Sequence, residues 1–254
     1  MALLELKNLT LSFGGLMAVK DVSFTVEENS ITGLIGQNGA GKTTIFNLLT
    51  HVYRPNSGSV ILEGEELKGN RPHKAVAQGL SRTFQNIRLF RNMSVLDNIK
   101  VGYLQQGKYS VTEGILRFPS YWREEKAVDE KARELLRAFD MEPYADYYAG
   151  NLPYGQQRQL EICRALATNP RVLLLDEPAA GMNPSETEGL MDRINALREK
   201  FSMAILLIEH DMKLVMGICD KIVVLNYGCV IAEGCPEEIR NNEEVITAYL
   251  GSEA

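Results

Sequence analysis

Gly36-Gln37-Asn38-Gly39-Ala40-Gly41-Lys42-Thr43 is the stretch that decides the fold of this chain. It fits the pattern G-x-x-x-x-G-K-[S/T], the phosphate-binding P-loop. The apolar run Ile31 to Ile35 before it predicts a strand, and Thr44 to Leu49 after it predicts a helix. Strand, glycine turn and helix form the context that the pattern requires. A glycine-rich turn with a chance lysine is the alternative, and this context disfavours it.

The residue types in this loop suit the binding of a nucleotide. Its glycines let the backbone curl so that successive N–H groups point at phosphate oxygens, and the helix N-terminus adds partial positive charge. Lys42 is placed to reach the β- and γ-phosphates, and the Thr43 hydroxyl to ligate Mg²⁺. The loop residues expected to bind the cofactor are Gly36, Asn38, Gly39, Gly41, Lys42, Thr43 and Thr44.

Composition limits the possible classes of protein. The chain has 254 residues, enough for one large domain or two small ones, and its 45% hydrophobic content is typical of a globular protein. A net charge of −6 argues against nucleic acid as a partner. We find no apolar run long enough to span a bilayer, and the residues Met1 to Glu5, without a charged or an apolar leader segment, do not predict a signal peptide. The four cysteines form no C-x-x-C pair, so we expect reduced, mostly buried thiols.

Short apolar runs organise the rest of the chain. Leu4 to Phe13 and Val19 to Val26 predict strands around Gly14-Gly15, and Ser59 to Leu62 predicts a third, so we expect a mostly antiparallel N-terminal sheet. Later continuous apolar runs predict buried parallel strands at 172–175, 204–208 and 222–225. Helices are expected over about 185–200 and 241–250. The predicted fold class is α/β.

Residues from about 92 to 158 differ, because they carry helical signals and no strand signal. Val95 to Leu104 predicts one helix and Arg123 to Phe139 a strongly amphipathic one, with the less regular stretch Tyr109 to Trp122 between them. We therefore expect a helical subdomain inserted in a single domain of residues 1–254. Its aromatic side chains are expected in the core of this lobe, with a partner surface as the alternative; they are Phe118, Tyr121 and Trp122.

Polar side chains follow several of the predicted strands. Asp176 and Glu177 follow 172–175, and His210 comes two residues after 204–208. The carboxyl ends of parallel strands face the ligand crevice, so Asp176 is placed to hold Mg²⁺ and Glu177 to orient or activate the attacking water. His210 is a candidate γ-phosphate contact, and Gln85, after another predicted strand, a candidate ligand of Mg²⁺ or water. Exposed acids, a structural histidine and an ordinary polar glutamine are the alternatives.

Together these residues resemble the ATP-binding-cassette (ABC) ATPases, and the resemblance covers essentially the whole chain. Residues 36–43 look like the Walker A motif, and residues 172–177 like Walker B with its catalytic glutamate. Gln85 matches the Q-loop glutamine and His210 the switch histidine, while Phe13 matches the aromatic that stacks on adenine. The resemblance implies ATP and Mg²⁺ as cofactors. It also implies a P-loop NTPase (RecA-like) core with an N-terminal antiparallel β subdomain and an inserted α-helical subdomain.

Two segments depart from the family pattern. Leu152-Pro153-Tyr154-Gly155-Gln156 lies where the family carries its signature, L-S-G-G-Q. Pro153 replaces the serine whose hydroxyl touches the γ-phosphate of the opposing subunit, so Gly155 N–H and Gln156 are expected to carry this part of the cofactor site. Asn183 replaces the usual aspartate of the D-loop, residues 180–183. These departures leave open whether hydrolysis is slowed.

The departures narrow the resemblance, together with the stretches 82–90 and 209–216 and the enlarged helical lobe. These features together resemble the LivG type, the ATPase subunits of bacterial branched-chain amino-acid importers. The resemblance implies a subunit that hydrolyses ATP to power import of branched-chain or related hydrophobic amino acids. In this family two ATPase subunits pair head to tail, and each ATP lies between Walker A of one chain and the signature of the other. A homodimer and a heterodimer both stay open.

The resemblance also implies partners and a location. Transmembrane permease subunits supply the pathway, and a periplasmic or lipid-anchored substrate-binding protein acts indirectly. The subunit is then peripheral, at the cytoplasmic face of the bacterial inner membrane.

Other functions remain as alternatives. One is the ATPase of a lipid or lipopolysaccharide export system, and another a soluble ABC ATPase that acts on DNA or ribosomes. The acidic balance and the absence of heptads disfavour the second of these. A kinase or GTPase is disfavoured because no N-K-x-D pattern is present. A non-catalytic nucleotide-binding module is disfavoured by Glu177 and His210.

Overall fold

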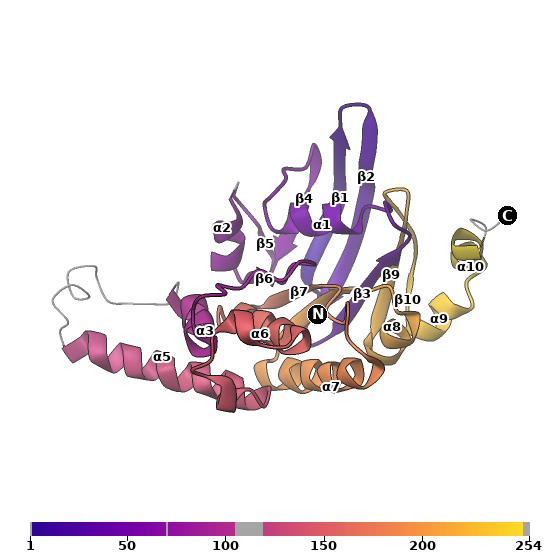
Figure 1. Cartoon of the computed structure of the whole chain (residues 1–254). Coiled ribbons are helices and arrows are strands. Elements are labelled where there is room, and N and C mark those ends of the chain that lie inside the picture. Colours follow the sequence, from indigo (N-terminus) through magenta and orange to yellow (C-terminus); the bar gives the residue numbers. More distant parts are fainter. Residues whose placement is uncertain (1, 70, 105–118, 251–254) are drawn as a thin grey trace. The chain divides into compact units, whose positions relative to one another are not determined.

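The computed structural model describes residues 2–69, 71–104 and 119–250 (Figure 1). The chain divides into two compact units. The first comprises Met1–Arg82, Arg171–Ala179 and Ile194–Ala254, and the second comprises Thr83–Pro170 and Ala180–Arg193.

The first unit begins with an antiparallel sheet of strand order β2-β1-β4-β5 (Figure 1). β1 (Ala2–Phe13) and β2 (Leu16–Glu27) form a hairpin in which Phe13 pairs with Leu16 across Gly14-Gly15. β4 (Ser57–Leu62) pairs with β1, and β5 (Glu65–Glu66) pairs with β4. Leucine and valine side chains of these strands join one hydrophobic core. The predicted N-terminal antiparallel sheet is confirmed.

A second sheet in this unit has the strand order β10-β9-β3-β8-β7-β6. Its parallel strands are β6 (Leu80–Arg82), β7 (Val172–Asp176), β8 (Ala204–Ile208), β3 (Ile31–Gly36) and β9 (Lys221–Asn226), and β10 (Cys229–Gly234) pairs antiparallel with β9. Every residue of β3, β7 and β8 is buried, as expected for strands covered on both faces. The predicted α/β core is confirmed.

Short helices complete the first unit. α1 (Lys42–Leu49) follows β3 directly and buries Ile45, Phe46, Leu48 and Leu49. The others are α2 (Pro72–Ala77), α8 (Met212–Ile218), α9 (Pro236–Arg240) and α10 (Glu243–Leu250). The Asp211 carboxylate caps α8 by accepting hydrogen bonds from the N–H groups of Lys213 and Leu214.

The described part of the second unit is helical. α3 (Val95–Tyr103) packs against α5 (Pro119–Ala138) and against α6 (Tyr154–Leu166). Single 3₁₀ turns at Glu142–Tyr144 and Ala149–Asn151 connect α5 to α6. α7 (Pro184–Phe201) begins in this unit and ends in the first. The helices predicted over 95–104, 123–139 and 185–200 are confirmed, with α5 beginning four residues earlier than predicted.

The expectation that the aromatic side chains of this lobe are buried is wrong for Trp122, whose surface is 56% exposed. The apolar stripe of α5 runs through Val128, Ala132, Leu135 and Leu136. Tyr121 lies seven residues before Val128 and so falls on this stripe, whereas Trp122 is turned about 100° from it. Phe118 and most of the irregular stretch 109–122 lie outside the described residues.

The cysteines are free thiols, and their burial differs from one to another. Cys163 and Cys219 are buried as expected, but Cys229 is half-buried and Cys235 is exposed. Cys235 occupies the N-cap of α9, where its N–H donates to the Glu238 carboxylate, and this position lies at the surface. Among the described helices, none has the length and apolar character needed to cross a membrane.

Candidate nucleotide-binding and hydrolysis site

The P-loop joins β3 to α1 within the first unit, and its glycines adopt a left-handed backbone. Gly39 has φ +82° and Gly41 has φ +106°. A Cβ atom at Gly41 would lie 2.8 Å from the carbonyl oxygen of Ala18, so only glycine fits there. Asn38, Gly39 and Thr43 are exposed, Thr44 is half-buried and Gly36 is buried. A curled glycine backbone followed by a helix N-terminus is suited to binding phosphate.

The Lys42 side chain folds over this loop. Its Nζ donates hydrogen bonds to the carbonyl oxygens of Gly36 at 2.6 Å and Gln37 at 2.9 Å. Burial lowers the pKa of Lys42, and the nearby carboxylates of Glu177 and Asp176 partly offset this by raising it. The ammonium group therefore contacts the backbone of the loop and lies near two carboxylates, that of the predicted catalytic Glu177 and that of the predicted Mg²⁺ ligand Asp176.

The ends of β7 and β8 bring Glu177 and His210 together. His210 Nε2 lies 2.7 Å from Glu177 Oε1. Glu177 has φ +49°, a left-handed conformation that is uncommon for a residue with a side chain, and its N–H donates to the Ile208 carbonyl at 2.9 Å. This turn ties the ends of the two strands together and fixes the direction of the Glu177 side chain.

Glu209, which the sequence did not single out, holds the backbone next to this pair. Its buried carboxylate accepts hydrogen bonds from the N–H groups of Ala179 at 2.9 Å and His210 at 3.1 Å. Burial raises the pKa of Glu209, against the lowering effect of these two donors. Glu209 therefore fixes the backbone on both sides of the contact between Glu177 and His210. The sequence signal that could have identified Glu209 is its position as an acidic residue directly after an apolar strand.

Arg82 is a second residue that sequence reasoning missed. Its Nη2 lies 2.6 Å from Asp176 Oδ2, and both side chains are buried. The same guanidinium donates to Asn47 Oδ1 at 2.7 Å and covers the ring of Phe46 on α1. Arg82 therefore holds the predicted Mg²⁺ ligand against the helix that follows the P-loop. Its partners are about 35 and 94 residues away in the chain, so no local sequence pattern reveals the contact.

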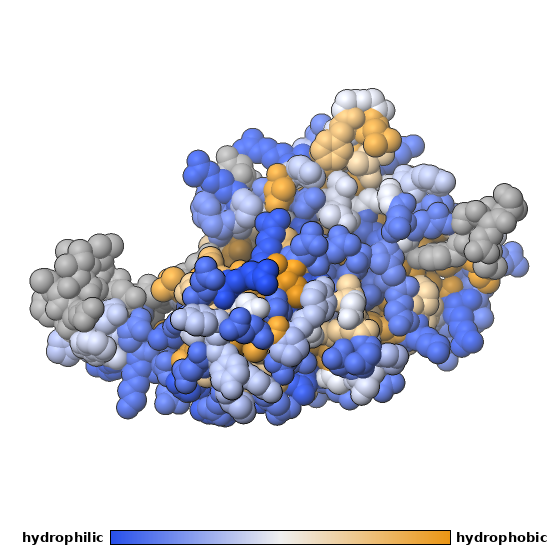
Figure 2. Space-filling model, in the orientation of Figure 1, coloured by the Kyte–Doolittle hydropathy of each residue, from blue (hydrophilic) through white to orange (hydrophobic). Residues whose placement is uncertain are grey.

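Phe13 ends β1 with 45% of its surface exposed. Its ring meets that of Tyr53 edge-to-face, with the centroids 5.1 Å apart. Leu16 and Met17 across the hairpin are also exposed, and Figure 2 shows apolar side chains gathered at this end of β1 and β2. An exposed aromatic face is what stacking on a nucleotide base requires.

Gln85, Gly155 and Gln156 lie in the second unit. Gln85 follows β6, and its carbonyl oxygen accepts a hydrogen bond from Arg158 at 2.7 Å. Pro153 is the N-cap residue of α6 and provides no side-chain cap, so the loss of the family serine also removes a capping hydroxyl. The Gln156 Oε1 atom is buried and has no hydrogen-bond partner among the described residues.

Oxygen donors are the ligands that Mg²⁺ prefers, and the Thr43 hydroxyl and Asp176 carboxylate are of this type. Among the described residues, no three His, Cys, Asp or Glu side chains gather as a metal cage. Mg²⁺ usually keeps waters and phosphate oxygens and needs only one or two protein ligands, so this sparse set fits it.

Comparison with known proteins defines the family. A profile described as "ABC transporter" matches residues 19–180, and one described as "Branched-chain amino acid ATP-binding cassette transporter" matches residues 229–254. The chain therefore belongs to the ABC transporter family, as a nucleotide-binding ATPase subunit. The predicted family and P-loop NTPase fold class are confirmed.

Particular relatives are similar over nearly the whole chain. The branched-chain amino acid transport ATP-binding protein BraF of Pseudomonas aeruginosa is 48% identical over 249 residues, which cover 98% of each chain. LivG of Escherichia coli is 47% identical over the same length and coverage. The lipopolysaccharide export ATP-binding protein LptB of Haemophilus influenzae is 32% identical over 253 residues, with 100% of this chain and 99% of the relative covered. The solved ADP conformation of MJ1267, a cassette of an ABC transporter, has a TM-score of 0.85 at 31% identity and covers 99% of each chain.

Proposed function

We propose that this subunit hydrolyses ATP to power the import of branched-chain, or related hydrophobic, amino acids through partner permeases. The observation that carries the ATPase chemistry is the gathering of Lys42, Glu177 and His210 beside the glycine loop of one unit. The substrate class rests on the 47–48% identity with BraF and LivG, against 32% with LptB.

The geometry supports a division of labour between these side chains. Lys42 and the loop N–H groups bind the β- and γ-phosphates. Thr43 and Asp176 would hold Mg²⁺, which neutralises phosphate charge when bound. Glu177 is oriented by its strained backbone and by His210, so its carboxylate accepts a proton from the attacking water. His210 steadies Glu177 and contacts the γ-phosphate.

Completion of the site requires a second ATPase subunit, identical or related. Gly155 and Gln156 at the start of α6 are the residues that would face the γ-phosphate bound by the other chain. Among the described residues, a Cβ atom at Gly155 would meet nothing closer than the Glu186 carboxylate at 3.6 Å, so the packing around it does not require glycine there. A phosphate that approaches from the other subunit would require glycine, since the backbone N–H of residue 155 must come close to it.

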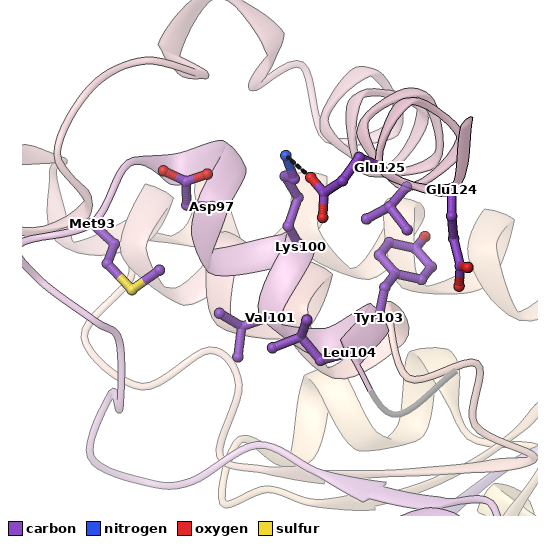
Figure 3. Close-up of a pocket in the computed structure, with 9 residues that line it drawn as sticks. Met93, Asp97, Lys100, Val101, Tyr103, Leu104, Glu124 and Glu125 are labelled. Carbon is purple, nitrogen blue, oxygen red and sulfur yellow. Dashed lines mark ion pairs between the residues drawn. The ribbon is translucent and has the colours of Figure 1, made fainter. Parts of the chain in front are cut away.

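A hollow in the second unit is a candidate seat for a permease helix. It has a volume of about 230 Å³ and lies between α3 and α5 (Figure 3). Its apolar side includes Met93, Val101 and Leu104, and Leu104 is largely exposed. Lys100 forms ion pairs with Glu125 and Asp129 at the α5 side. Such a partner would hold the subunit at the cytoplasmic face of the inner membrane, next to the pathway served by a substrate-binding protein.

Two measurements test the proposal. Lys42→Ala should abolish or severely weaken ATP binding by calorimetry, because the phosphates lose their cation, and unchanged affinity would remove the P-loop assignment. The substrate class is tested with the subunit reassembled with its permeases in vesicles. Leucine with its binding protein should stimulate turnover, whereas stimulation by lipopolysaccharide alone would favour the export function of the LptB relative.

A further inference from the structure

The second unit contains a fully buried ion pair for which the proposed chemistry gives no role. Arg158 and Glu161 lie one turn apart on α6, with 0% and 2% of their side-chain surfaces exposed. Arg158 Nη1 lies 2.9 Å from Glu161 Oε2. Burying two charges costs more than their attraction returns unless further hydrogen bonds satisfy them. The partners of this pair therefore indicate what it is for.

Those partners are the backbone of the Gln85 segment. Arg158 donates to the carbonyl oxygens of Phe84 at 2.6 Å and Gln85 at 2.7 Å. Glu161 Oε1 accepts from the N–H groups of Phe84 at 3.4 Å and Arg88 at 3.2 Å. Two side chains of α6 thus hold two N–H groups and two carbonyl oxygens of the segment 84–88, about 73 residues away in the chain.

Tyr154 extends this contact to a third segment. It stands where the family signature has its first glycine, at the beginning of α6. A Cβ atom at Gly181 would lie 3.1 Å from Tyr154 Cε1, which is a tight contact, and Gly181 has φ +78°, a left-handed conformation that favours glycine. The Tyr154 hydroxyl lies 3.5 Å from Arg158 Nη2, at the long limit of a hydrogen bond. The side chain that departs from the signature therefore lies between the D-loop and the buried pair.

We propose that Arg158, Glu161 and Tyr154 are positioning residues that join the Gln85 segment, the signature turn and the Gly181 turn into one rigid body. The proposal deepens the proposed function and rests on it. The sequence makes Gln85 a candidate ligand of Mg²⁺ or water at a bound ATP, whereas Gly155 would serve the ATP bound by the other subunit. A rigid link between them makes the two ATP sites of a dimer respond to one displacement of this body. None of the three residues needs to touch the nucleotide.

The test removes both buried charges at once, because removing one leaves the other unpaired. Arg158→Met/Glu161→Leu in the full chain keeps approximate volume and loses all six hydrogen bonds that the two side chains make. Amide hydrogen exchange at residues 84–88 should accelerate by roughly ten- to a hundred-fold, the factor expected for losing hydrogen bonds to charged groups, while exchange in α1 is unchanged. The maximal ATP turnover should fall roughly ten-fold with KM for ATP within about two-fold, since the first unit still binds nucleotide.

Two further variants keep the test interpretable. Arg133→Met removes a partly exposed ion pair with Asp129 from α5 in the same unit, and it should leave exchange and turnover unchanged. Glu161→Gln retains an acceptor oxygen for the two N–H donors, and it serves if the double variant does not fold. It should show the same changes at smaller size.

The proposal is overturned if exchange at 84–88 is unaffected in the double variant. It is also overturned if exchange accelerates there with normal turnover, or if α1 loosens equally, which would make the pair a general element of stability. Failure of the proposed function would be recognised in a different measurement, because ATP binding would then not depend on Lys42.

Discussion

At the scale of single residues, we expect Glu177 to be the side chain on which hydrolysis depends most. Asp176 is paired with Arg82, and Glu177 is the acid that contacts His210, at 2.7 Å. Glu177→Gln keeps the shape and removes the charge, so ATP binding should survive while turnover falls by roughly 10²–10⁴-fold, the range for a positioned acid–base group. Steady-state turnover and filter-bound ATP measure the two effects. Glu188→Gln, at an exposed carboxylate of α7, is the control, and wild-type turnover in Glu177→Gln would remove Glu177 from the mechanism.

Arg82 gives a second prediction at this scale, about charge balance. Arg82→Met leaves an apolar side chain beside Phe46 but removes the guanidinium that covers this ring and pairs with the buried Asp176 carboxylate. The free energy of unfolding should fall by about 3–5 kcal/mol, the usual effect of breaking a buried ion pair. Mg²⁺ with nucleotide should then stabilise the variant more than the wild type, because it supplies the missing positive charge. Urea unfolding with and without Mg²⁺–ATP measures the stabilisation of each protein. Arg82→Lys, which keeps the charge, is the control. Equal stabilisation of Arg82→Met and the wild type would mean that Asp176 does not hold the metal.

At the scale of elements, the start of α6 carries a glycine, Gly155, that we expect function and not packing to require. Gly155→Asp adds a charged side chain where phosphate is expected, and turnover of the assembled transporter should fall by roughly 10²–10³-fold, as when a backbone donor to the reacting group is lost. ATP binding through Lys42 should persist. Gly189→Asp, in the same unit, is the matched control, because a Cβ atom at Gly189 would meet nothing within 4 Å in the part of the chain that the structure describes. Normal turnover in Gly155→Asp would show that residues 152–156 are not the signature.

The elements also show how far sequence reasoning reaches. Strands such as β7 and β8 and the P-loop turn were predictable, because continuous apolar runs and glycine spacing are local signals. Glu177 and His210 were placed at one edge for the same reason. The contacts of Arg82 and Arg158 join segments about 94 and 73 residues apart, so no local pattern around either arginine predicts its partner. The exposure of Trp122 was missed because a 100° turn separates it from the stripe that Tyr121 follows.

At the scale of the whole molecule, the proposed half-sites predict association that depends on ATP. One chain carries Lys42, Asp176, Glu177 and His210 in its first unit and Gly155 in its second. If each ATP is completed by the Gly155 of another copy, the chain should be largely monomeric without ATP, since we propose that the permeases normally hold the pair together.

The Glu177→Gln form is the suitable protein for this measurement, because it should bind ATP without consuming it and so accumulate the closed pair. Sedimentation velocity with Mg²⁺–ATP should show a dimer, and with ADP or without nucleotide a monomer. Adding Lys42→Ala to the same chain should abolish the dimer, because no phosphate is then held for the opposing Gly155 N–H to meet. Gly155→Asp should do the same while ATP binding persists, which separates loss of the nucleotide from loss of the interface. Association that ignores ATP would contradict the shared site, and an ATP-bound chain that stays monomeric at every concentration would require a related second ATPase subunit as its partner.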